Sequence, residues 1–201
     1  MRRLVMVLGC FLGFSLFTPA QEPPVEPIRV HYDGPWWISG GLGEGQLRLS
    51  SDQQKYKRVS TFAISFAGGH RVGNHVRAGI DVGGWTLQAF DLNNPAVGES
   101  VGNVLAVVDY LPVRKRGLYV RGGVGWATYN NNRPTGTNGS GLAWEAGSGY
   151  EFRVRGGLRL APTVTYAAGR LGNDPYATIP LTARRYNVFD FKLAVAYHFG
   201  Q

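Results

Sequence analysis

The residues best suited to acid–base or nucleophilic chemistry are four histidines, and they are spread along the chain. His31 lies in a proline-rich stretch, His70 and His75 flank a predicted turn, and His198 stands near the C-terminus. A hydrolytic site needs a nucleophile, a base and an orienting group brought together. The single cysteine, Cys10, lies in the apolar N-terminal segment, so the sequence offers no thiolate cluster for a metal. We therefore predict no catalytic residue, no metal site and no cofactor.

A second group of reactive side chains consists of acids and bases that alternate with apolar residues. In the C-terminal stretch NVFDFKLAVAYHFGQ, large apolar residues take every second position from Phe189 to Phe199, and Asp190, Lys192 and His198 lie between them. A period of two is typical of a β-strand with two unlike faces. The charged residues predicted to share one such face and to form ion pairs are Arg77, Asp81, Arg121, Glu145, Arg159, Asp190 and Lys192.

The elements that must position these charges are eight strands. Alternating stretches occur at residues 36–50, 59–68, 75–85, 101–111, 117–129, 141–152, 157–167 and 187–199, and glycine, asparagine and proline separate them. No stretch shows the periodicity of an amphipathic helix, and the 29 glycines disfavour long helices. The predicted fold class is all-β.

The two faces of these stretches suggest what each one meets. One face carries large apolar residues, and the other carries glycine, alanine, serine, threonine and a few charges of both signs. Small residues and paired charges suit the inside of an eight-stranded barrel, which side chains just fill, while an apolar outside suits lipid. The joining segments alternate between long and short, as external loops and periplasmic turns do. We predict an eight-stranded antiparallel up-and-down transmembrane β-barrel; a soluble sandwich or a lipocalin-like barrel is the alternative.

The N-terminal residues 1–20 have the layout of a cleaved signal peptide, with two arginines, an apolar run and small residues before a polar segment. An uncleaved anchor helix is the alternative. We expect cleavage after Ala20, a proline-rich periplasmic linker over residues 21–35 and a barrel over residues 36–201. The mature chain would hold 19 basic and 13 acidic residues, and its net charge of +6 favours anionic partners.

Ten aromatic residues lie near the ends of the predicted strands, where a membrane-interface girdle would place them. They are Trp36, Trp37, Trp85, Tyr110, Trp126, Tyr129, Trp144, Tyr150, Tyr186 and Phe199.

The stretches GLYVRGGVGWATY, GSGYEFRVRGGLRLAPTVTY and FDFKLAVAYHF resemble the small outer membrane β-barrel family, the OmpA/OmpX-type eight-stranded barrels. The resemblance runs from about Trp36 to Phe199 and involves patterns rather than signature motifs. It implies the outer membrane of a Gram-negative-type bacterium and contact with outer membrane lipid including lipopolysaccharide. We also expect a monomer, no nucleic-acid partner and, unlike full-length OmpA-type proteins, no periplasmic domain after the barrel.

The final strand also resembles the family's C-terminal assembly signal, with Tyr197 and Phe199 as its aromatic residues. This resemblance implies recognition by the barrel-assembly machinery. The sequence departs from the pattern because Gly200 and Gln201 follow Phe199, whereas the family pattern ends on the aromatic residue.

Three classes of function are compatible with such a barrel. The favoured one is a structural or surface-interaction role, in which loops over residues 130–141 and 168–185 meet lipid, matrix or another cell. A narrow pore or small-solute carrier is the alternative, although opposite charges inside argue for a plug. A lipid A-modifying enzyme is less favoured, because the deacylase type of small barrel carries a serine two residues from a histidine, and here Gly200 occupies that place after His198.

Basic residues near the predicted external loops are candidate ligands for lipopolysaccharide phosphates, which accept charge-assisted hydrogen bonds. The predicted contacts are Lys55, Lys57, Arg58, Arg184 and Arg185. Solvated surface charge is the alternative interpretation.

Overall fold

The computed structural model describes residues 34–52, 57–86, 98–113, 117–131, 138–174 and 181–200. The predicted signal peptide and almost all of the predicted linker lie outside these ranges. In the described ranges the chain forms nine strands: β1 (Trp36–Ser50), β2 (Val59–Arg71), β3 (Val76–Thr86), β4 (Glu99–Tyr110), β5 (Leu118–Asn131), β6 (Gly139–Tyr150), β7 (Phe152–Arg155), β8 (Leu158–Asp174) and β9 (Leu181–Phe199). Over the same ranges, no helix has the length and apolar character needed to cross a bilayer.

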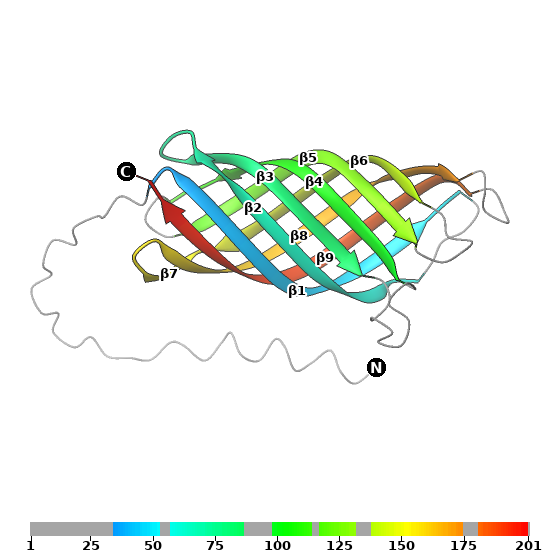
Figure 1. The fold of residues 1–201 in the computed structure, drawn as a ribbon, viewed down its shortest axis with the longest axis horizontal. Helices are drawn as coiled ribbons and strands as arrows, with labels where there is room; N and C mark the ends of the chain where they lie inside the picture. The colour runs from blue at the N-terminus through cyan, green and yellow to red at the C-terminus, as the bar shows by residue number, and fades with distance from the viewer. Residues whose placement is uncertain are drawn as a thin grey trace, which may run out of the picture. The chain divides into compact units, whose positions relative to one another are not determined.

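The strands close into a single antiparallel barrel. Strands β1 to β6 pair in chain order, β9 joins β1 to β8, and the pairing of β6 with β8 closes the ring. Only Glu151 separates β6 from the short β7, which pairs with the start of β8. Because β6 and β7 together form one strand of the wall, the nine strands make an eight-stranded barrel (Figure 1). The predicted fold is confirmed.

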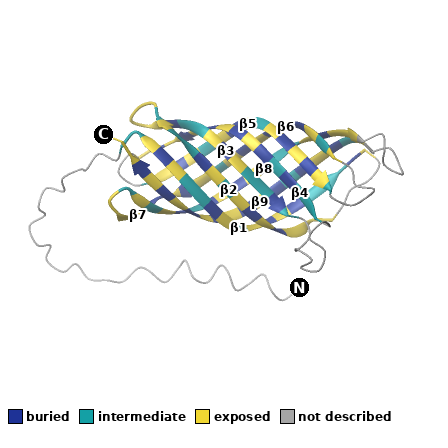
Figure 2. Ribbon diagram, viewed as in Figure 1, coloured by how far each residue is buried: buried dark blue, intermediate teal, exposed yellow. Residues whose placement is uncertain are grey.

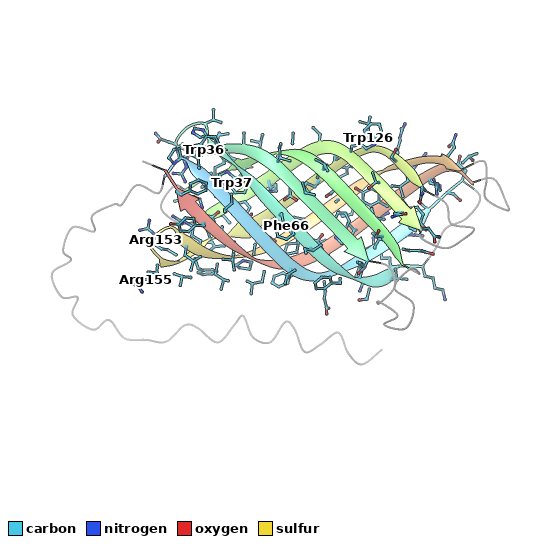
Figure 3. All side chains as sticks on the ribbon, viewed as in Figure 1. Trp36, Trp37, Phe66, Trp126, Arg153 and Arg155 are labelled. Carbon is cyan, nitrogen blue, oxygen red and sulfur yellow. The ribbon has the colours of Figure 1, made fainter. Side chains whose placement is uncertain are left out.

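Alternation along each strand sorts the side chains between the inside and the outside of this barrel (Figure 2). In β5, for example, Tyr119 is buried between the exposed Leu118 and Val120. Trp36 and Trp37 likewise occupy opposite faces of β1, with exposed fractions of 51% and 3% (Figure 3). The exposed large apolar residues of all the strands therefore form a continuous outer surface, as the sequence pattern predicted.

The apolar outer surface ends before the strands do. On β9 it extends from Phe189 to Phe199, which matches the roughly 9–11 residues of a tilted membrane-crossing strand. On β1 the outward positions change from Leu42 to the polar Glu44. The strands thus continue past the apolar surface at the end that carries the long connections.

Two predicted connections are partly strand. The predicted loop over residues 168–185 is largely taken up by β8 and β9, which have 17 and 19 residues. Glycine at position 172 (φ 71°) and Ala183 (φ 50°) lie at irregularities in their pairing. The segment between the predicted stretches 141–152 and 157–167 also contains most of β7, so that the turn itself is reduced to Gly156 and Gly157.

The predicted girdle of ten aromatic residues is wrong at four positions. Four of the rings are buried inside the barrel, because each lies at a strand position whose side chain points inward. They are Trp37, Trp85, Tyr129 and Tyr186. The other six rings are exposed on the outer surface. Closeness to a strand end therefore did not decide which face a ring occupies.

Candidate functional site

The interior of the barrel holds most of the chemically reactive groups, and the first of them form an ion-pair network across three neighbouring strands. The register places Asp109 of β4 directly between Arg77 of β3 and Arg121 of β5. Asp109 Oδ2 lies 3.0 Å from Arg77 Nη2, and Asp109 Oδ1 lies 2.7 Å from Arg121 Nε. Arg121 also reaches Asp81 Oδ2 at 2.7 Å through Nη1. One buried carboxylate therefore pairs with two guanidinium groups, and a second carboxylate, Asp81, supplies a further partner for Arg121.

The network continues to the opposite wall through Glu151. Arg77 Nη1 donates to Glu151 Oε1, while Glu151 Oε2 lies 3.2 Å from His198 Nε2 and 3.6 Å from Arg159 Nε. The rings of Trp37 and Tyr119 flank the Arg77 guanidinium at 5.1 and 5.2 Å, within cation–π range. This charged layer therefore ties β3 to the β6–β7 junction, β8 and β9.

A separate polar group surrounds Asp190 of β9. Asp190 Oδ1 lies 3.1 Å from Lys192 Nζ and accepts the hydroxyl of Thr165, while Oδ2 accepts the indole N–H of Trp85 at 2.9 Å. Glu145 of β6 is also buried, and its Oε1 has no hydrogen-bond partner among the described residues.

An apolar layer fills the interior toward the long connections. Leu47, Val101, Leu105 and Val188 are fully buried there together with other core residues. Trp85 and Tyr186 extend across the layer with their ring centres 6.1 Å apart. Apolar interior side chains of this kind pack closely against one another.

The structure places all seven residues of the predicted interior charge cluster on inward positions, but in more than one group. Arg77, Asp81 and Arg121 share the first network, and Arg159 approaches it through Glu151. Asp190 and Lys192 pair with each other. The seventh residue, Glu145, makes no ion pair with the described residues.

Sequence reasoning missed the two carboxylates that organise the charged layer, Asp109 and Glu151. A signal for Asp109 was present in the stretch predicted over residues 101–111. Asp109 lies an even number of residues from Val101, Leu105 and Val107, which places it on the same face of the strand. Glu151 similarly continues the inward parity of β6.

The predicted lipopolysaccharide contacts do not all lie on the surface. Lys57, Arg58 and Arg185 are exposed, and Lys55 lies outside the described residues. The prediction for Arg184 as a lipid contact is wrong, because its side chain is buried at the barrel mouth. There Arg184 Nη2 donates to the backbone oxygens of Asn138 at 2.8 Å and Leu171 at 3.3 Å.

The two aromatic residues of the predicted assembly signal lie on the outer surface of β9. Tyr197 and Phe199 are exposed, and their rings stack with centres 6.1 Å apart and planes 14° apart. The side chain of His198, which lies between them in sequence, points inward and contacts Glu151 and Arg77.

The other two described histidines lie near the opposite ends of one short turn. His70 packs edge-on against Trp36, and His75 Nδ1 lies 2.8 Å from the backbone oxygen of Leu111.

Space for water lies inside the barrel beside the charged residues. A cavity of about 30 Å³ lies beside Arg77, Arg121 and Lys192, which is room for one or two water molecules. No group of three or more histidine, cysteine, aspartate or glutamate side chains is arranged to bind a metal in the described ranges.

Comparisons with known proteins identify the class of fold. No protein-family model and no curated protein sequence matches the chain. Among solved structures, Neisserial surface protein A has 14% sequence identity and a TM-score of 0.52, with 82% of this chain and 97% of that chain covered. The outer membrane protein AlkL, solved in DMPC lipid bilayers, has 13% identity and a TM-score of 0.50, with 91% and 98% covered.

The chain has the fold of a small outer membrane β-barrel. An outer membrane barrel of this kind must keep charged groups away from lipid, and here most of the buried acids and bases pair with one another inside. The predicted location, the outer membrane of a Gram-negative-type cell, is that of the solved barrels which share the fold. Two of its contacts, Arg77 with Glu151 and His198 with Glu151, join parts of the wall that are distant in sequence.

Proposed function

We propose that the chain is a sealed outer membrane β-barrel that acts as a structural platform, with its extracellular connections available for surface interactions. The observation that carries this proposal is the filled interior. A neutralised charged layer and a close-packed apolar layer lie one after the other along the barrel axis. A narrow pore would need a continuous polar path, and the apolar layer interrupts it.

Conductance in planar bilayers tests the sealed barrel against the pore or carrier. The folded full-length chain is expected to give no discrete conductance steps under conditions in which an established porin does. Folding is checked on the same sample by its heat-dependent mobility on a denaturing gel. Regular unit steps from heat-modifiable protein would refute the seal and favour the pore. A soluble product without a mobility shift would instead favour the lipocalin-like alternative.

The geometry around His198 supports a structural role over a lipid-modifying enzyme. The side-chain partners of His198 in the described part of the chain are Glu151 and Arg77, and none is a hydroxyl group. A general base needs to lie within reach of the nucleophile that it activates. Mass spectra of lipid A from cells with and without the chain test this assignment, and a new mass difference would overturn it.

Recognition by the barrel-assembly machinery is part of the same proposal. The paired rings of Tyr197 and Phe199 on the outer surface support it, because an extended strand can present them together to a partner. Replacing Phe199 by alanine is expected to lower the amount of heat-modifiable barrel in outer membranes. Replacing the equally outward Phe191 by alanine is the matched control. An equal loss in both variants would contradict a specific assembly signal.

A further inference from the structure

Four arginines follow one another around the outer surface at the loop end of the barrel. Arg185 and Arg170 are exposed on β9 and β8, and the half-buried Arg48 lies on the outward side of β1; these three strands lie side by side (Figure 1). Arg170 lies directly opposite Arg185, and Arg48 is the diagonal neighbour of Arg185 because it lies opposite Asn187. The exposed Arg58 directly precedes Val59, which lies opposite Leu47, so Arg58 adjoins Arg48. We call Arg58, Arg48, Arg185 and Arg170 the arginine row.

The positive charge of the arginine row is not neutralised within the described chain. None of its four guanidinium groups forms an ion pair with a described carboxylate, in contrast to the inward Arg77 and Arg121. Like charges directly opposite each other on one face of an antiparallel pair are destabilising. The juxtaposition of Arg170 with Arg185 therefore favours an anion from outside the chain.

The position of the row indicates where that anion resides. On β9 the outward residues run from Phe199 to Phe189 before Asn187 and Arg185 follow. On β8 Tyr166 is the last large apolar residue on the outer face before Arg170. The arginines thus lie just beyond the apolar surface, at the depth where lipid headgroups begin.

We infer that the arginine row binds the phosphate groups of outer-leaflet glycolipid. Guanidinium groups form charge-assisted, bidentate hydrogen bonds with phosphate, and several groups on neighbouring strands can share one headgroup. The apolar residues next to the row, such as Phe189 and Tyr166, would contact the acyl chains of the same lipid. The inference rests on the proposed location in the outer membrane with the loop end outward, and it adds Arg48 and Arg170 to the predicted contacts.

Lipid titration of the purified, folded full-length barrel in detergent tests the inference. The probes are rough-type lipopolysaccharide and the same lipid after removal of its phosphates, with bound lipid counted by native mass spectrometry. The double variant Arg170→Gln/Arg185→Gln is expected to bind the phosphorylated lipid about tenfold more weakly, as expected when about 1.4 kcal/mol of charge-assisted contact is lost. Wild type is expected to bind the dephosphorylated lipid about tenfold more weakly than the phosphorylated lipid, for the same reason.

The matched control removes two exposed arginines from the other rim, at Arg153 and Arg155 of β7 (Figure 3). Arg153→Gln/Arg155→Gln is expected to bind the phosphorylated lipid as wild type does. An equal loss in both double variants, or equal binding of both lipids by wild type, would overturn the inference. If the barrel is instead absent from outer membranes while binding follows the expected pattern, the proposed location fails and the phosphate site stands.

Discussion

Removal of the Asp109 carboxylate is the sharpest perturbation of the charged layer. Asp109 is fully buried and accepts three hydrogen bonds, at 3.0 Å from Arg77 and at 2.7 and 3.1 Å from Arg121. Removing one partner of a buried ion pair costs about 3–5 kcal/mol, because it leaves an uncompensated charge. Arg77 keeps Glu151 and Arg121 keeps Asp81. We therefore expect Asp109→Ala to lower the free energy of unfolding by about 3 kcal/mol, the low end of that range.

The assay is urea unfolding of the barrel in lipid vesicles, followed by tryptophan fluorescence and by the fraction of heat-modifiable protein on unboiled gels. Glu44→Ala is the matched control, because Glu44 is an exposed carboxylate on β1 without an ion pair to the described residues. Its effect is expected to stay within about 0.5 kcal/mol. A loss below about 1 kcal/mol for Asp109→Ala would mean that water solvates both guanidinium groups. The charged layer would then be open to solvent, and the argument for a sealed interior would fail with it.

Three further changes test other parts of the fold by the same unfolding assay. Leu105→Ala, in the apolar layer, is expected to cost about 2–5 kcal/mol through the cavity it leaves; a cost near zero would show that the layer is loosely packed. Leu193→Arg, on the lipid-facing side of β9, is expected to cost about 2–4 kcal/mol, whereas Glu44→Arg beyond the apolar surface is expected to cost about 0–1 kcal/mol. Ala183→Gly is expected to stabilise the barrel by up to about 1 kcal/mol, because the left-handed φ of 50° suits glycine; destabilisation would show that the alanine side chain makes contacts worth more than the strain.

Alternation predicted the walls of the barrel closely. The stretch predicted over residues 36–50 is β1 itself, and the stretch over residues 117–129 differs from β5 by one or two residues at its ends. A period of two is a local property, since it depends only on which side of one strand must be apolar. For the same reason the inward placement of residues such as Arg77 and Asp190 could be predicted without knowing any partner strand.

Partners inside the barrel could not be predicted, because they depend on register. Asp109 lies between Arg77 and Arg121 only because β4 pairs with β3 and β5 at those residues. A shift of two residues would keep every side chain on its face and yet separate these charges. The division of the interior into a charged and an apolar layer also depends on register, so alternation alone predicted a plug of paired charges but not the apolar layer beside it.

Arg184 and Arg185 are adjacent in sequence but point to opposite sides of the barrel wall, and the irregular pairing just before them sets which one points inward. Irregular pairing opposite Gly172 and the left-handed Ala183 precede them, and β9 is regular from there on. Arg184 then points inward, where it stacks 5.7 Å from the Tyr129 ring centre and holds backbone oxygens of the neighbouring hairpins. Arg185 points outward into the arginine row, opposite Arg170. Because adjacent residues in a strand must face opposite sides, only one of the pair can serve lipid binding while the other closes the barrel mouth. Arg184→Gln is therefore expected to destabilise the barrel while leaving binding of phosphorylated lipid unchanged. Arg185→Gln is expected to weaken binding of phosphorylated lipid while leaving the stability of the barrel unchanged.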